Sequence, residues 1–207
     1  MREVILEEKS TMKHINQVGR SMIEMLGVLA IIGVLSVGGI AGYSKAMTKY
    51  RINKASDQIS QLAQNIRTLY TSQKTYSTLS STVIQRAHLA PEEMYEGTGS
   101  STLTNPFGGS VWVYSSGKMY SGDNKAFYMY MTSVPQEACI ELLTQDWGGG
   151  SSSGLIAFGT SGVTSKYYGC TTSSSTCRCA DAGVMPVNDA VNACSSTTSN
   201  TIYWKFY

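Results

Sequence analysis

The feature that most constrains this chain is a long uncharged segment near its N-terminus. From Met25 to Tyr43 no residue carries a charge. As an α-helix this run would extend roughly 29 Å at about 1.5 Å per residue, which matches the hydrocarbon core of a bilayer. One acidic residue, Glu24, directly precedes the run, although a carboxylate carried to the bilayer centre costs about 2.5–3.5 kcal/mol. Such a charge is usually retained because another group pairs with it, so Glu24 is the first candidate functional residue.

Glu24 also has a fixed place relative to a glycine. Cleavage after Gly19 would make Arg20 the first residue and Glu24 the fifth, and it would create a new α-amino group next to the apolar run. This arrangement resembles the class III signal of type IV prepilins. The resemblance implies cleavage between Gly19 and Arg20 by a prepilin peptidase, N-methylation of Arg20, and a role for Glu24 in assembly. Arg20 departs from the Phe, Met or Leu that is more common at this position of the family.

Two other interpretations of the N-terminal segment are an uncleaved signal anchor and a removed secretory signal. The apolar run is long for the hydrophobic region of a secretory signal, and no clean small-residue cleavage site follows it. Residues 1–19 are interpreted as a leader peptide that begins at Met1 or at Met12. Lys and Arg flank the apolar run on both sides, so the positive-inside rule does not fix its orientation.

Apolar periodicity continues beyond the uncharged run. A stripe at helical spacing predicts one helix from about Ser21 to about Ser72, with one face buried in its second half; the stripe consists of Ala55, Ile59, Leu62, Ile66 and Leu69. The alternative is two helices that break near Gly38, Gly39 and Gly42. The glycines of the apolar run would also let neighbouring helices approach closely.

The sequence of residues 76–207 predicts a globular head with both helices and strands. Strands are expected at 111–115, 126–134, 155–158 and in the final TIYWKFY segment, and SKYYGC is a further strand candidate. Short helices are expected near 79–88, after Pro135 and from Pro186 to Cys194. TTSSSTCRCADAG is expected to be an irregular loop, and the aromatic residues of the strands are expected to lie in the core. The fold class is therefore α+β, with a long N-terminal helix packed on an antiparallel sheet.

The cysteine distribution and the low charge limit the possible functions. All five cysteines follow residue 138, which favours disulfides in an oxidising compartment and places the C-terminal part outside the cytoplasm. There is no CxxC pair, and only two histidines are present, so no metal site or cofactor is expected. Only 14% of the residues are charged and no basic cluster stands out, so no nucleic-acid partner is expected. No motif of an enzyme is present.

The late cysteines extend the resemblance to the type IVb pilins, the group of the toxin-coregulated, bundle-forming and conjugative thin pilins. The resemblance implies a disulfide between Cys139 and Cys194, which bounds the region at 139–194. Cys170 is left to pair with Cys177 or Cys179, and one thiol remains. The implied domains are the leader at 1–19, the helix at 20–75 with its membrane or filament-core part at 20–43, and the head at 76–207.

The function that the resemblance implies is a major pilin, the structural subunit of a type IV pilus that serves adhesion, aggregation or conjugation. The precursor would sit in the inner membrane with a periplasmic head and then enter an extracellular homo-oligomeric helical filament, with the help of the peptidase and the pilus assembly machinery. The alternatives are a minor pilin or tip adhesin, and a pseudopilin of type II secretion.

Overall fold

The computed structural model describes residues 16–95, 102–115, 125–148, 153–161, 177–179 and 183–207. It divides into two units, Met1–Met47 and Thr48–Tyr207, and α1 contributes to both. The helices are α1 (Asn16–Tyr70), α2 (Ser81–Arg86), the 3-10 turn η1 (Glu92–Met94), α3 (Gln136–Thr144) and α4 (Val187–Ala193). The strands are β1 (Leu103–Thr104), β2 (Ser110–Ser115), β3 (Phe127–Val134), β4 (Leu155–Gly159), β5 (Cys177–Cys179) and β6 (Asn200–Phe206).

The first helix is continuous, as the sequence predicts. α1 contains no proline and passes through Gly38, Gly39 and Gly42 without a break, although each glycine costs about 1 kcal/mol relative to alanine. The alternative of two separate helices is therefore wrong for this chain. The cleavage position predicted after Gly19 lies within the first turns of α1.

The second half of α1 is amphipathic and supplies one side of the core. Ala55, Ile59, Leu62 and Ile66 are fully buried, as their spacing predicts. The prediction is wrong at the end of the stripe, where Leu69 is 42% exposed and Tyr70 is only 4% exposed. The apolar face of an α-helix drifts because its repeat is 3.6 residues, and at this point the drift brings the ring of Tyr70 inward, where it contacts Tyr76.

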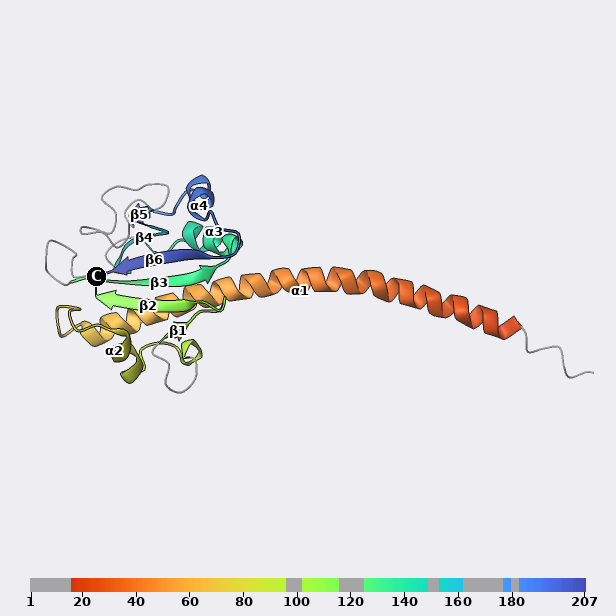
Figure 1. Cartoon of the computed structure of the whole chain (residues 1–207), viewed down its shortest axis with the longest axis horizontal. Helices are drawn as coiled ribbons and strands as arrows, with labels where there is room; N and C mark the ends of the chain where they lie inside the picture. Colours follow the sequence, from red (N-terminus) through yellow and green to blue (C-terminus); the bar gives the residue numbers. More distant parts are fainter. Residues whose placement is uncertain (1–15, 96–101, 116–124, 149–152, 162–176, 180–182) are drawn as a thin grey trace, which may run out of the picture. The chain divides into compact units, whose positions relative to one another are not determined.

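The sheet of the head is antiparallel and six-stranded, in the order β1-β2-β3-β6-β4-β5. The last strand, β6, therefore lies in the middle of the sheet, between β3 and β4 (Figure 1). Alternate residues of the central strands point into the core, among them Met129 and Met131 on β3 and Ile202 and Trp204 on β6. The second half of α1 belongs to the same core cluster.

The aromatic side chains divide between the two faces of the sheet, so the expectation that they all lie in the core is wrong. Phe127 and Trp204 are buried. Trp112, Tyr114, Tyr128, Tyr130 and Tyr203 occupy the opposite face and contact one another, with ring centroids between 5.2 and 6.4 Å apart. The strands have a period of two, so a run of consecutive aromatics necessarily populates both faces.

Two further differences concern short elements. The predicted irregular loop contains β5, which pairs with Ala157, Phe158 and Gly159 of β4. β1 was not predicted; it pairs with β2. The SKYYGC segment lies outside the described residues. The other predicted helices and strands are present, at α2, α3 and α4 and at β2, β3, β4 and β6.

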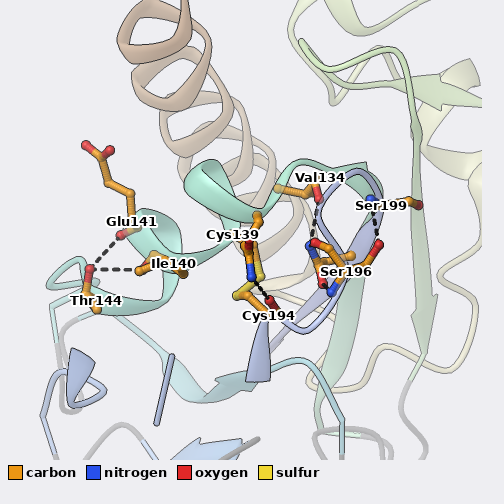
Figure 2. The surroundings of a disulfide bond; sticks show 10 residues. Val134, Cys139, Ile140, Glu141, Thr144, Cys194, Ser196 and Ser199 are labelled. Carbon is orange, nitrogen blue, oxygen red and sulfur yellow. Dashed lines mark hydrogen bonds between the residues drawn. A yellow bond between two sulfur atoms is a disulfide. The ribbon is translucent and has the colours of Figure 1, made fainter. Parts of the chain in front are cut away.

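Asn200 stabilises a β-bulge between β3 and β6. Its buried side chain donates to the carbonyl oxygens of Val134, at 3.1 Å, and Ser196, at 2.7 Å, and it accepts from the backbone N–H of Ser196 (Figure 2). The pairing of the two strands shifts register between Met131 and Val134, so these bonds replace ladder bonds that the bulge removes.

We expect the substitution Asn200→Ala to lower the free energy of unfolding by about 2–3 kcal/mol, because it leaves buried backbone groups unpaired. Chemical denaturation of the full chain in detergent measures this difference. Asn192→Ala, at an exposed position of α4, is the matched control and should change stability by less than about 0.5 kcal/mol. Equal effects of the two substitutions would contradict the role given to Asn200.

Candidate assembly site

The first half of α1 exposes nearly all of its apolar side chains. From Met22 to Tyr43, the large apolar side chains are each between 52% and 76% exposed. α1 is the one helix among the described residues that is long and apolar enough to cross a membrane. Soluble monomers rarely expose a contiguous apolar patch larger than a few hundred Å². A surface of this kind requires an apolar environment, which lipid or other helices of the same type can supply.

Glycines in this segment make room for neighbouring helices. A Cβ atom built at Gly27, Gly33, Gly38, Gly39 or Gly42 meets no atom of the described chain within 4 Å. These glycines are therefore not required by packing within this unit, whereas their missing side chains permit close approach of a second helix. The hydroxyl of Ser36 donates to the carbonyl oxygen of Ile32 at 2.7 Å, so this polar group is satisfied inside the helix.

Glu24 lies on α1 at the start of the exposed apolar segment, and its side chain is exposed. In a helix, residues four apart lie on the same face, so position 20 is one turn from Glu24. The backbone of Gly19 and Arg20 is helical. The predicted cleavage, methylation and assembly roles of Gly19, Arg20 and Glu24 stay predictions.

In the head, a disulfide joins Cys139 of α3 to Cys194 directly after α4, as the resemblance implied (Figure 2). Their Cα atoms are 6.0 Å apart, and both residues are fully buried. The bond encloses a sequence separation of 55 residues, for which the chain-entropy model gives about 4 kcal/mol of stabilisation. It fixes the end of the chain segment that leads into β6.

Hydrogen bonds around the disulfide reinforce the same connection. The side-chain amide of Gln136 donates to the carbonyl oxygen of Cys194 at 2.9 Å, and its backbone N–H donates to the carbonyl oxygen of Thr197 at 3.2 Å. Pro135 precedes α3, which suits the first turn of a helix because proline lacks a backbone N–H. The sequence indicated the proline but gave no sign that Gln136 contacts the other end of the disulfide-bounded region.

The second half of α1 is tied to α3 and to η1 by polar contacts. Lys49 pairs with Glu141, and the side-chain amide of Gln145 donates to the hydroxyl of Ser56 at 2.7 Å. Lys54 pairs with Glu93 at 3.3 Å. Exposed pairs of this kind contribute at most about 1 kcal/mol each, so they orient the elements more than they stabilise them. Their partners are distant in sequence, and sequence analysis missed them.

The inner cysteines remain untested. Cys177 and Cys179 are the two ends of β5, and Cys170 lies outside the described residues. The pairing of Cys170 with Cys177 or Cys179 stays a prediction. Within the described part of the chain, no three His, Cys, Asp or Glu residues gather closely enough to hold a metal ion.

Comparison with known proteins links this architecture to a family. The family model PilS, described as "PilS N terminal", matches residues 49–205. The chain is 28% identical over 182 residues to the major structural subunit of bundle-forming pilus from Escherichia coli O127:H6 (strain E2348/69 / EPEC), covering 87% of this chain and 89% of that protein. A protein of the same description from Escherichia coli O111:H- is 29% identical over 130 residues, which are 63% of this chain and 65% of that protein.

The fold comparison agrees with the family match. The crystal structure of type IV b pilin from Salmonella typhi superposes with a TM-score of 0.51 at 23% identity, covering 73% of this chain and 97% of that one. At this level of identity the likeness concerns the fold. Because the family match covers most of the chain, the chain belongs to the PilS family, and its fold is that of a type IV b pilin.

Proposed function

We propose that this chain is the major pilin of a type IV pilus, the subunit that repeats along a surface filament. The observation that carries the proposal is the exposed apolar half of α1, with Glu24 near its start. The related proteins of the bundle-forming pilus have the same role, and the disulfide-bounded head is typical of subunits that face an oxidising compartment. The role is structural rather than catalytic.

The proposed maturation begins at the inner membrane. The apolar half of α1 anchors the precursor there with its head in the periplasm, and a prepilin peptidase removes residues 1–19. Arg20 then becomes the N-methylated first residue. Assembly machinery transfers the subunit into the growing filament, which extends outside the cell. Methylation retains the positive charge of the amine, so the N-terminus can still pair with a carboxylate.

In the proposed filament, Glu24 sets the axial register between neighbouring subunits. The carboxylate of an incoming subunit pairs with the N-terminal amine of a neighbour, and the exposed apolar faces then exchange lipid for one another. Opposite charges about 4 Å apart attract by roughly 4 kcal/mol at an effective dielectric constant near 20, before the cost of desolvation. The pairing compensates the charge of the carboxylate in the apolar environment only when the axial offset of the two subunits is correct.

The abundance of the chain in surface filaments tests the major role. We expect that filaments sheared from the cell surface consist mostly of this chain when the fraction is separated by gel electrophoresis and quantified. Deletion of its gene should abolish the filaments. A chain that makes up only a trace of the filament protein would contradict the major role and favour a minor pilin or tip adhesin.

A further inference from the structure

A basic cavity of about 450 Å³ opens beside the C-terminal end of α1, within the head. Its lining combines three cationic side chains with three aromatic rings: Arg67, Lys74, Lys125, Tyr70, Tyr76 and Tyr207. None of the described residues that line it is acidic. A volume of this size is within the range of roughly 300–1,000 Å³ that small-molecule sites occupy.

Arg67 is held in place before any ligand arrives. Its Nη1 atom donates to the carbonyl oxygen of Ser153 at 2.8 Å, and its guanidinium carbon lies 5.8 Å from the centroid of the Tyr207 ring. Gly154 has a φ of +70° and passes so close that a Cβ atom there would lie 2.4 Å from the Cζ atom of Arg67. Among the described residues, no carboxylate pairs with this guanidinium. The group is therefore positioned, and no carboxylate side chain of the described residues compensates its charge.

The end of α1 does not account for this charge. A helix C-terminus carries roughly half a negative elementary charge, which cations in the last turn can complement. The positive charge of the three cationic side chains that line the cavity is much larger than this partial negative charge of the helix end. A negative charge on the α-carboxylate of Tyr207 would still leave the cavity with a net positive charge. Burial raises the pKa of Tyr76, while the charge of Arg67 acts to lower it, so this hydroxyl is neutral at physiological pH.

We propose that this cavity binds an acidic sugar, whose carboxylate pairs with Arg67. Guanidinium and carboxylate groups fit each other in a bidentate geometry, and the two lysines supply further charge to the same ligand. Tyr70 and Tyr76 are buried, and the partly exposed ring of Tyr207 offers aromatic surface to the apolar face of a sugar ring. The hydroxyls of Thr68 and Thr71 donate to the helix carbonyl oxygens of Gln64 and Arg67, so their remaining lone pairs can accept from sugar hydroxyls.

Titration of the full chain in detergent with N-acetylneuraminic acid tests this site, with lactose as the neutral sugar and sodium sulfate as the plain anion. We expect the acidic sugar to bind at least about tenfold more tightly than either, because lactose lacks a carboxylate for Arg67 and sulfate lacks a sugar ring for Tyr207. Raising the ionic strength from about 0.05 to about 0.5 M should weaken binding, because the two lysines are exposed.

Two variants and one control locate the binding. The pair Lys74→Gln and Lys125→Gln lies at exposed positions and should weaken binding by about three- to tenfold without affecting the fold. Arg67→Gln should weaken it by tenfold or more. Arg51→Gln, an exposed position of α1 outside the cavity, is the matched control and should leave affinity unchanged. Thermal denaturation of each variant shows whether it remains folded.

Two outcomes would overturn the proposal. Equal affinity for sulfate and the acidic sugar would reduce the cavity to a plain anion site, and unchanged binding in the lysine double variant would place the ligand elsewhere. The inference does not depend on filament assembly. A Glu24→Gln chain that forms no filaments should still bind the sugar, so failure of the site and failure of the proposed function are distinguishable.

Discussion

Replacing Glu24 with glutamine is expected to abolish surface filaments while the precursor still inserts in the membrane and the head still folds. Glutamine keeps the size of the side chain but removes the charge, so the attraction to the neighbouring N-terminal amine, roughly 4 kcal/mol at about 4 Å, is lost. That loss predicts at least about a hundredfold fewer assembled subunits, because the same contact repeats along the filament. Immunoblots of the sheared and whole-cell fractions measure the ratio.

The same substitution separates two explanations of Glu24. A charge buried in an apolar environment costs several kcal/mol, so a carboxylate without a partner in the filament would make Glu24→Gln assemble better than the original chain. A carboxylate that pairs with the amine predicts the opposite. Asp57→Asn, at an exposed acid in the second half of α1, is the matched control and should assemble normally. Filaments of Glu24→Gln at the original level would contradict the pairing.

Removing the disulfide by the double substitution Cys139→Ala and Cys194→Ala is expected to lower the free energy of unfolding by about 4 kcal/mol. The physical reason is that the unfolded chain gains the freedom of an unclosed loop of 55 residues. For a protein of this size the loss corresponds to a fall in melting temperature of about 8–16 °C. Tryptophan fluorescence during denaturation of the full chain in detergent follows the change, because Trp147 and Trp204 contact each other beside the core.

The double variant is a sharper test than a reducing agent, since reduction would also break any disulfide among the other three cysteines. The single variant Cys139→Ala should lose the same loop closure and leave a free thiol at Cys194. A double variant that unfolds within about 1 kcal/mol of the original chain would show that the hydrogen bonds of Gln136 and Asn200 hold this region without the covalent bond.

Sequence patterns predicted the local elements of this fold well. The position of α1, the start of α3 after Pro135 and the final strand follow from apolar periodicity and from the geometry of proline, which are properties of neighbouring residues. The apolar run that follows Glu24 could be recognised in the sequence for the same reason. These features depend on spacing along the chain, which the sequence contains directly.

Features that depend on distant segments could not be predicted in this way. The placement of β6 between β3 and β4 brings Tyr203 beside Tyr130, far from it in sequence. The cavity at the end of α1 likewise combines Arg67 with Lys125 and Tyr207, which no local pattern connects. Asn105 is a smaller case: its side chain accepts from the N–H groups of Phe107 and Gly109 and donates to the carbonyl oxygen of Thr132, whereas the sequence indicated only a turn.

The most direct test of the pilin account is the intact mass and N-terminal sequence of protein sheared from the cell surface. The account predicts one abundant chain that begins at Arg20 and carries a methyl group on its α-amine. A chain that retains residues 1–19 and stays in the membrane fraction would contradict it, and would leave a membrane-anchored protein whose disulfide-bounded head has another role.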